Sequence, residues 1–189
     1  MSRLAKTATL GFTLIEVLVT MLIFALGLLG CAALQGRAQK SQQEAYQRVY
    51  AINMLTIMLG NISANSDARG CYQLGGTELG VGYRKPYKCT SYGSAEAQQR
   101  AADSVNQWSA LLQGVHTING ENNVGGLLNA RGCIEFDSAS SRYIVTVVWQ
   151  GLTEARATDS SCGEGNYGGA SNRLRRLVSG TFYAPDLKG

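Results

Sequence analysis

The chain has 189 residues and a formal net charge of +4, and it is long enough for one membrane helix and one modest globular domain. A charge this small gives no support for nucleic-acid binding, which usually shows as a clustered basic face. Glycine is abundant, with 23 residues, and proline is scarce, with two, so we expect long glycine-rich loops between the regular elements.

An apolar run from Leu14 to Leu34 follows a short leader that contains Arg3 and Lys6. A helix needs about 20 apolar residues to cross a bilayer, so this run is long enough to span one. The run contains one acid, Glu16. A charged carboxylate costs roughly 2.5–3.5 kcal/mol in such a segment, so we expect the chain to use this acid.

The order of leader and apolar run differs from that of an ordinary secretory signal, whose cleavage site follows the apolar region. Here the only leader-like boundary, at Gly11, precedes the apolar run. Cleavage there would leave the apolar segment on the mature protein. Loss of Arg3 and Lys6 would lower the formal charge by two, from +4 to +2.

The segment from Gly11 to Glu16 reads GFTLIE and continues as Val17-Leu18-Val19, and it resembles the start of type IV pilin-like prepilins. In that family a dedicated peptidase cuts after the glycine and methylates the new amino-terminal phenylalanine. The resemblance therefore implies cleavage between Gly11 and Phe12 and N-methylation of Phe12. It also implies that Glu16 pairs with the amino terminus of a neighbouring subunit during assembly.

The rest of the chain is more loosely similar to minor pilins of the PilV type, the type IV pilus modification proteins. The features that carry this similarity are the helix after the membrane segment, the strand Tyr143–Gln150 and the scattered cysteines. The similarity implies a minor pilin, a structural subunit that helps initiate pilus assembly, lies at or near the tip and serves twitching motility or cell adhesion.

The same resemblance implies the partners and the location. The partners would be other minor pilins, the major pilin, the prepilin peptidase and inner-membrane lipid, with no small-molecule substrate, cofactor or metal and no nucleic acid. The protein would lie in the bacterial inner membrane with a periplasmic domain, and then in the pilus fibre or at its tip on the cell surface.

The first predicted element is one long helix from Phe12 to about Ser66, a stretch without proline. We divide the chain into a leader (1–11), a transmembrane helix (12–34), an amphipathic continuation of that helix (35–66) and a periplasmic α+β domain (67–189). Past the membrane segment, apolar residues at steps of three and four predict a stripe that packs on the domain. These residues are Ala45, Val49, Ile52, Leu55, Leu59 and Ile62.

A second helix is predicted over Ala95–Leu112, with Ser94 as its N-cap. Three strands are predicted after it: Cys133–Asp137, Arg142–Gln150 and about Leu174–Tyr183. Residues 138–141 form the turn between the first two strands. The alternation in the last strand does not reveal its buried face. The predicted fold is α+β, a pilin fold in which the long N-terminal helix packs on a small antiparallel sheet.

Four of the five cysteines lie beyond the membrane segment, and an even number in an exported domain suggests disulfides. Among the three possible pairings we favour Cys71–Cys89 and Cys133–Cys162, because each would close a glycine-rich loop with little core of its own. A four-cysteine zinc site is disfavoured, since no C-x-x-C pair occurs. The fifth, Cys31, lies in the apolar run and is expected to act as a small hydrophobe.

The residue pattern gives no support for an enzyme. The single histidine, His116, lies in a loop rich in asparagine and glycine and is expected to be solvated. No G-x-S-x-G, H-E-x-x-H or phosphate-binding loop motif occurs. Glu135 and Asp137 share one face of a strand, and we expect a solvated pair with Arg142 as a charge partner.

Two further groups of side chains could contact partners. Arg173, Arg175 and Arg176 form the densest basic cluster, and we expect them to be a solvated strand edge that resists unwanted pairing. The tyrosines around the Cys71–Cys89 loop either form a binding surface or cover a small core.

Three other classes of protein remain as alternatives. Leu28-Leu29-Gly30-Cys31 resembles the lipobox of bacterial lipoproteins, in which Cys31 would be lipidated. A pseudopilin of a type II secretion system shares the leader, the helix and an α+β domain. A membrane-tethered enzyme is the third, and it lacks an identifiable site.

Overall fold

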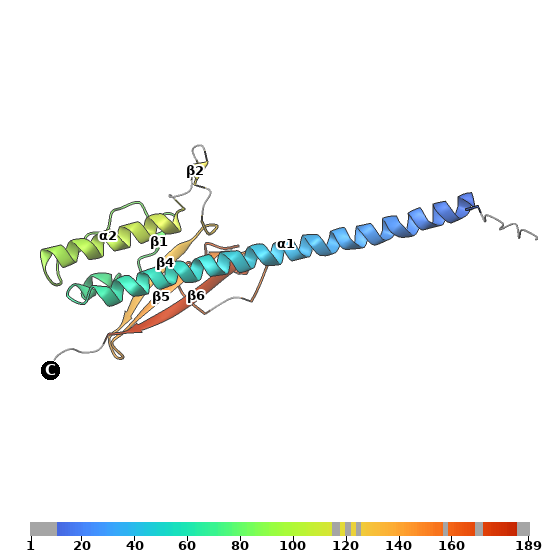
Figure 1. Ribbon diagram of the computed structural model, residues 1–189. Coiled ribbons are helices and arrows are strands. Elements are labelled where there is room, and N and C mark those ends of the chain that lie inside the picture. The colour runs from blue at the N-terminus through green and yellow to red at the C-terminus, as the bar shows by residue number, and fades with distance from the viewer. Residues whose placement is uncertain are drawn as a thin grey trace, which may run out of the picture. The chain divides into compact units, whose positions relative to one another are not determined.

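The computed structural model of the chain describes residues 11–114, 118–119, 122–123, 126–156, 159–168 and 172–184. It is α+β, with a long N-terminal helix and a small antiparallel sheet (Figure 1). The chain divides into two compact units, Met1–Gln42 and Gln43–Gly189, which we describe separately.

Helix α1 spans Leu14–Ala64, and its first part makes up the helical portion of the N-terminal unit. Every described side chain from residue 11 to residue 42 is exposed. By length and composition, α1 is the one described helix that is long and apolar enough to cross a membrane. The prediction of one continuous helix from Phe12 to about Ser66 is therefore confirmed to within two residues at each end.

Helix α2 spans Ala95–Leu112, the same residues that the sequence predicts. The side chain of Ser94 accepts a hydrogen bond from the main-chain nitrogen of Ala97, which confirms the predicted N-cap. A short 3₁₀ helix, η1 (Arg69–Tyr72), follows α1. In the C-terminal unit α2 lies beside the last part of α1 (Figure 1).

The main sheet is antiparallel, with strand order β1-β4-β5-β6. Its strands are β1 (Leu79–Gly80), β4 (Arg131–Asp137), β5 (Arg142–Gln150) and β6 (Arg175–Tyr183). A separate two-stranded sheet joins β2 (Ile118–Asn119) to β3 (Asn122–Asn123). The three strands expected from the sequence are confirmed, with β5 matching at both ends and β4 beginning two residues earlier.

The main core lies between the helices and one face of the sheet. Alternate residues of β5 enter this core from the sheet: Tyr143, Val145, Val147 and Trp149. The buried residues of α1 are Ala51, Met54, Leu55, Met58 and Ile62.

The predicted stripe on α1 is wrong in its first half. Val49 and Ile52 are 59% and 43% exposed. Apolar residues occupy several sides of this part of α1, so more than one stripe fits the spacing. Packing against α2 and the sheet selects Ala51, Met54 and Met58.

The inner face of β6 is the face that carries Val178, Gly180 and Phe182. Val178 and Phe182 pack against the main core. A Cβ atom at Gly180 would lie 2.9 Å from Leu59 and 3.2 Å from Leu55, so glycine allows α1 to approach the strand closely. The missing side chain explains why the alternation in the sequence does not reveal this face.

A smaller core covers the opposite face of the sheet. Its buried members are Cys133, Val148, Cys162 and Tyr167, and Leu174 and Leu177 pack against them. Both faces of the sheet are therefore covered, one by helices and the other by the glycine-rich loop that follows β5.

Candidate functional site

The N-terminal segment carries the residues of the predicted processing site. Gly11, Phe12 and Thr13 lie outside regular structure, immediately before α1. The carbonyl oxygen of Thr13 accepts hydrogen bonds from the main-chain nitrogens of Glu16, at 3.1 Å, and Val17, at 3.3 Å. Thr13 Oγ1 also lies 3.4 Å from the nitrogen of Glu16. Thr13 therefore satisfies main-chain donors of the first turn, and the Gly11–Phe12 bond lies outside the helix.

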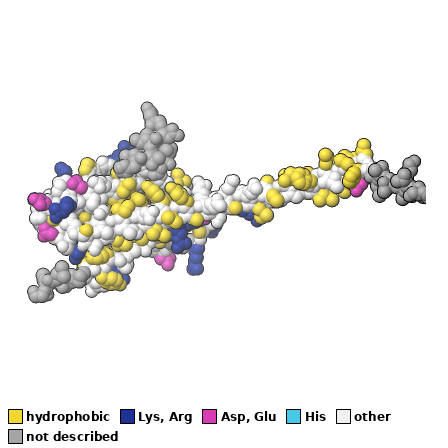
Figure 2. Space-filling view, in the orientation of Figure 1, with side chains coloured by type: hydrophobic (Ala, Val, Ile, Leu, Met, Phe, Trp, Pro, Cys, Tyr) yellow, Lys and Arg dark blue, Asp and Glu magenta, His cyan; other side chains and the backbone are white. Residues whose placement is uncertain are grey.

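Glu16 is the acid of the first turn of α1. Its negative charge is favourable there, because the exposed N–H groups give the start of a helix a partial positive charge. Its neighbours are exposed apolar side chains, and Figure 2 shows hydrophobic groups along the N-terminal part of α1. Among the described residues, no lysine or arginine forms an ion pair with Glu16.

Four cysteines form two disulfides in the C-terminal unit. Cys71 is bonded to Cys89 and Cys133 to Cys162, with Cα atoms 5.5 and 5.9 Å apart. These are the two pairs that the sequence favours. Cys31 is exposed and unbridged. The stretch between Cys71 and Cys89 also gives Tyr72, Leu74 and Leu79 to the main core, and the stretch between Cys133 and Cys162 contains β5. Each bridge therefore adds a covalent constraint to chain that is already packed.

The Cys71–Cys89 loop is also held by tyrosines. Tyr72 is buried, and its hydroxyl lies 2.9 Å from Ser104 Oγ on α2. The hydroxyl of Tyr87 donates to the carbonyl oxygen of Cys71. Burial raises the pKa of Tyr87 above its usual value. Tyr72 and Tyr87 therefore belong to the core and not to a binding surface. Tyr92, in contrast, is 47% exposed.

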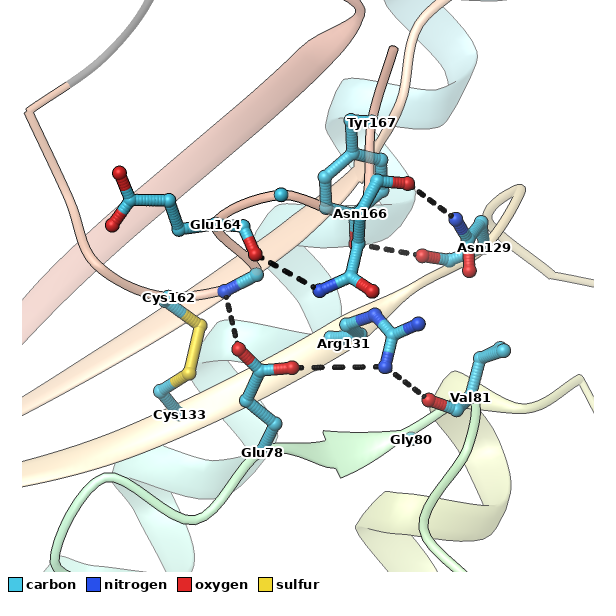
Figure 3. A network of polar contacts seen from close by, with 12 residues as sticks. Glu78, Gly80, Val81, Asn129, Arg131, Cys133, Cys162, Glu164, Asn166 and Tyr167 are labelled. Atoms are coloured by element: carbon cyan, nitrogen blue, oxygen red, sulfur yellow. Dashed lines mark hydrogen bonds and ion pairs between the residues drawn. A yellow bond between two sulfur atoms is a disulfide. The ribbon is translucent and has the colours of Figure 1, made fainter. Parts of the chain in front are cut away.

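A polar network holds the glycine-rich loop that follows β5 on the sheet, just after Cys162 (Figure 3). The carboxylate of Glu78 accepts from the main-chain nitrogen of Gly163 at 2.9 Å and lies 3.6 Å from Arg131. Arg131 in turn donates to the carbonyl oxygen of Val81 at 2.6 Å. Through these contacts Glu78 connects the loop at Gly163 to the start of β4.

Tyr167 closes the other side of this network. Its hydroxyl donates to the carbonyl oxygen of Asn129 at 2.7 Å (Figure 3). The ring is fully buried, and this burial raises the pKa of the hydroxyl far above its usual range. Because the hydroxyl stays protonated and hydrogen-bonded, Tyr167 is a structural anchor of the loop.

The prediction of a solvated strand edge at Arg173, Arg175 and Arg176 is right in part. The strand β6 is at the edge of the sheet and Arg173 is exposed, but Arg175 is buried and Arg176 is half-buried. Arg175 is 3% exposed and donates to the carbonyl oxygen of Cys162 at 2.9 Å. Arg176 lies 3.5 Å from Glu44 of α1 and donates to the carbonyl oxygen of Thr153 at 2.7 Å. Their charges are used inside the domain, and Glu44 lies too far away in the sequence to be recognised as a partner.

Asp137 is the last residue of β4, and its side chain binds the β4–β5 turn. Its carboxylate accepts from the main-chain nitrogen of Ala139 at 3.0 Å and from Ser140 Oγ at 2.6 Å. Arg142 lies 3.3 Å away, which confirms it as the charge partner. The pKa of Asp137 lies below its usual value, chiefly because of the hydrogen bond from the Ser140 hydroxyl. Glu135 is exposed on the same strand.

Other candidate residues add no second site. His116 lies outside the described residues. Within the described ranges, no three side chains of histidine, cysteine, aspartate or glutamate come together in a way that could hold a metal ion.

Two contacts that order the C-terminal unit have no signal in the sequence. Trp108 of α2 donates a hydrogen bond to the main-chain carbonyl oxygen of Met54 in α1. Asp67 accepts from the main-chain nitrogen and the hydroxyl of Ser94, at 2.9 and 2.7 Å. Each joins residues that are 27 or more positions apart, so no local pattern could reveal them.

Comparison with known proteins gives one match, at the N-terminal segment. Residues 7–32 match the family described as the prokaryotic N-terminal methylation motif. No curated protein and no solved structure matches the chain. The motif and the apolar helix that begins within it support a type IV prepilin-like protein, a pilin or pseudopilin, with a structural role and membrane anchoring.

Proposed function

We propose that this chain is a minor pilin, a structural subunit that helps to initiate a type IV pilus and lies at or near its tip. The observation that carries the proposal is the position of the methylation motif. It covers residues 7–32, directly at the start of a helix that continues to Ala64 and ends in a disulfide-bonded α+β domain.

The proposed processing step removes residues 1–11 and methylates the amine of Phe12. Residues 12–34 then anchor the chain in the inner membrane, and residues 35–66 continue the helix into a periplasmic domain of residues 67–189. The peptide bond to be cut lies outside α1, so the helix does not have to unwind for a peptidase to reach it.

Glu16 is the proposed assembly residue. It is the only acid among the apolar residues 14–34, and no cation of the described residues pairs with it. An unpaired charge in lipid or in a helix bundle is costly. In the filament, the amine of Phe12 from a neighbouring subunit would neutralise Glu16 and so favour one axial register of the helices.

The disulfide-bonded loops favour a pilus subunit over a pseudopilin, which would share the same leader. A deletion strain separates these two functions. Loss of surface pili and twitching, with secretion intact, supports the minor pilin, whereas loss of exoprotein export with normal pili would identify a pseudopilin.

The most direct test of processing is the intact mass of the mature chain purified from membranes. A chain that starts at N-methylated Phe12 supports the proposal. A chain that keeps Met1 contradicts it, and a diacylated chain that starts at Cys31 would identify a lipoprotein. Co-purification of the mature chain with other minor pilins would then identify its direct partners.

A further inference from the structure

The segment Gly82–Lys88, which we call the basic loop, carries three exposed cations, Arg84, Lys85 and Lys88. No aspartate or glutamate occurs between Gly80 and Ser94. In the part of the chain that the structure describes, these three cations form no ion pair, because the four pairs present use other arginines. Three positive charges are therefore presented to solvent without compensation.

The basic loop is held in place by α2. Asn106 accepts from the main-chain nitrogen of Tyr87 at 2.8 Å and donates to its carbonyl oxygen at 3.0 Å. Gln113 donates to the carbonyl oxygen of Tyr83 at 3.2 Å. The disulfide from Cys89 fixes the end of the loop. A ligand that binds the cations would not have to order this backbone, which lowers the entropic cost of binding.

An open groove runs along the line where the basic loop meets α2. Tyr83, Arg84, Lys85 and Pro86 line one side, and Asn106, Ser109, Ala110 and Gln113 line the other. Most of these side chains are polar or basic. Protein–protein interfaces usually have an apolar centre, whereas interfaces with nucleic acids are more polar and much more positive.

We propose that the basic loop and this groove bind the phosphate backbone of a nucleic acid, without reading its sequence. Phosphate contacts position a nucleic acid but carry no sequence information. The small net charge gave no support for such a partner. It is a sum over the whole chain, however, and does not show where the positive charges lie. That sum includes all the acids of the chain, none of which lies between Gly80 and Ser94 in the sequence. This proposal is independent of the proposed pilus role.

The test measures binding of the full mature chain, in an uncharged detergent, to a fluorescein-labelled 20-base-pair duplex by anisotropy between 50 and 200 mM salt. For three neutralised phosphates, the slope of log K against log salt should be about −2.7, at about −0.9 for each phosphate. The double variant Lys85→Gln/Lys88→Gln should reduce the slope to about −0.9 and weaken binding at 50 mM salt at least about tenfold.

Arg48→Gln/Arg156→Gln is the matched control, because it removes two exposed cations outside the basic loop. It should leave the slope unchanged and the affinity within about twofold. Equal losses in both double variants would show that net charge alone attracts the duplex and would overturn the proposal. Absence of duplex binding, or tighter binding of poly-glutamate than of the duplex, would also overturn it, the latter in favour of an acidic protein partner.

Discussion

Trp108 donates a hydrogen bond from Nε1 to the main-chain carbonyl oxygen of Met54, at 2.8 Å, and both residues are buried. This contact joins α2 to α1 at a defined position along both helices. The outer edge of the same indole ring lies over Gly132 of β4, where a Cβ atom would overlap it. One side chain therefore sets the spacing of two helices and a strand.

Gly132→Ala should destabilise the domain by about 1–3 kcal/mol, because the added methyl group has no space beside Trp108. Gly60→Ala is the matched control, since nothing lies within 4 Å of a Cβ atom at this exposed helical position. It should stabilise the helix by about 0.5–1 kcal/mol. Urea unfolding followed by circular dichroism measures both changes. Equal stability of the two variants would contradict the packing described for Trp108.

Glu16→Gln should leave leader processing and membrane insertion intact but reduce entry into the filament at least about tenfold, if the charge pairs with an amine across the subunit boundary. Glu16→Asp retains the charge and should retain most incorporation. Immunoblots of sheared filaments and of membranes measure the distribution of each variant. Normal incorporation of Glu16→Gln would rule out the proposed role of this carboxylate.

Gly11→Val should cause the full-length precursor to accumulate, because the proposed peptidase site accepts only a very small residue before the cut. Gly27→Val places the same side chain in α1, where nothing lies within 4 Å of the new Cβ, and should be processed normally. Intact mass of the membrane-bound chain distinguishes precursor from mature protein. Efficient cleavage of Gly11→Val would contradict the assigned site.

Cys133→Ala/Cys162→Ala should cost about 3 kcal/mol of stability, because the bridge closes a loop of 29 residues. The variant should also expose residues 159–168 to limited trypsin digestion at Arg156 or Arg173. Cys71→Ala/Cys89→Ala is the reciprocal control and should be cut at Arg84 or Lys88 instead, because Pro86 protects the bond after Lys85. If both variants gave the same fragments, the two bridges would not hold separate loops.

The carboxylates of Asp67 and Asp137 make the domain sensitive to acid. Hydrogen bonds lower both pKa values in the folded state, chiefly from the main chain of Ser94 to Asp67 and from the Ser140 hydroxyl to Asp137. Their contribution to stability is therefore complete above the unfolded pKa of about 3.9 and is lost as the pH falls through the lowered folded values.

Asp67→Asn/Asp137→Asn should accordingly lower the thermal midpoint at pH 7 and show a smaller further decrease between about pH 4 and pH 2. Asp103→Asn/Glu135→Gln, which removes two exposed carboxylates, controls for the change in net charge. Thermal unfolding across this pH range measures the effect. A parallel decrease in wild type and the double variant would show that other groups cause the acid sensitivity.

Local patterns predict the regular elements well. The Ser94 cap and helical spacing define α2, and β-branched and aromatic residues define β5, because these signals lie within one segment. The buried face of α1 could not be predicted, because its selection depends on Trp108 and the sheet. The role of Arg176 was also hidden, since its partner Glu44 lies 132 positions earlier in the chain.

The two bridges also make completion of the fold dependent on redox conditions. In a reducing compartment the four cysteines would remain reduced, and both glycine-rich loops would lose the disulfides that hold them to the domain. The basic loop would then lose its fixed end at Cys89. The covering of the outer sheet face would depend on the hydrogen bonds of Glu78, Tyr167 and Arg175 and on the smaller apolar core. Completion of the domain therefore requires an oxidant. A chain whose four thiols are still reduced would differ from the mature subunit in these two loops.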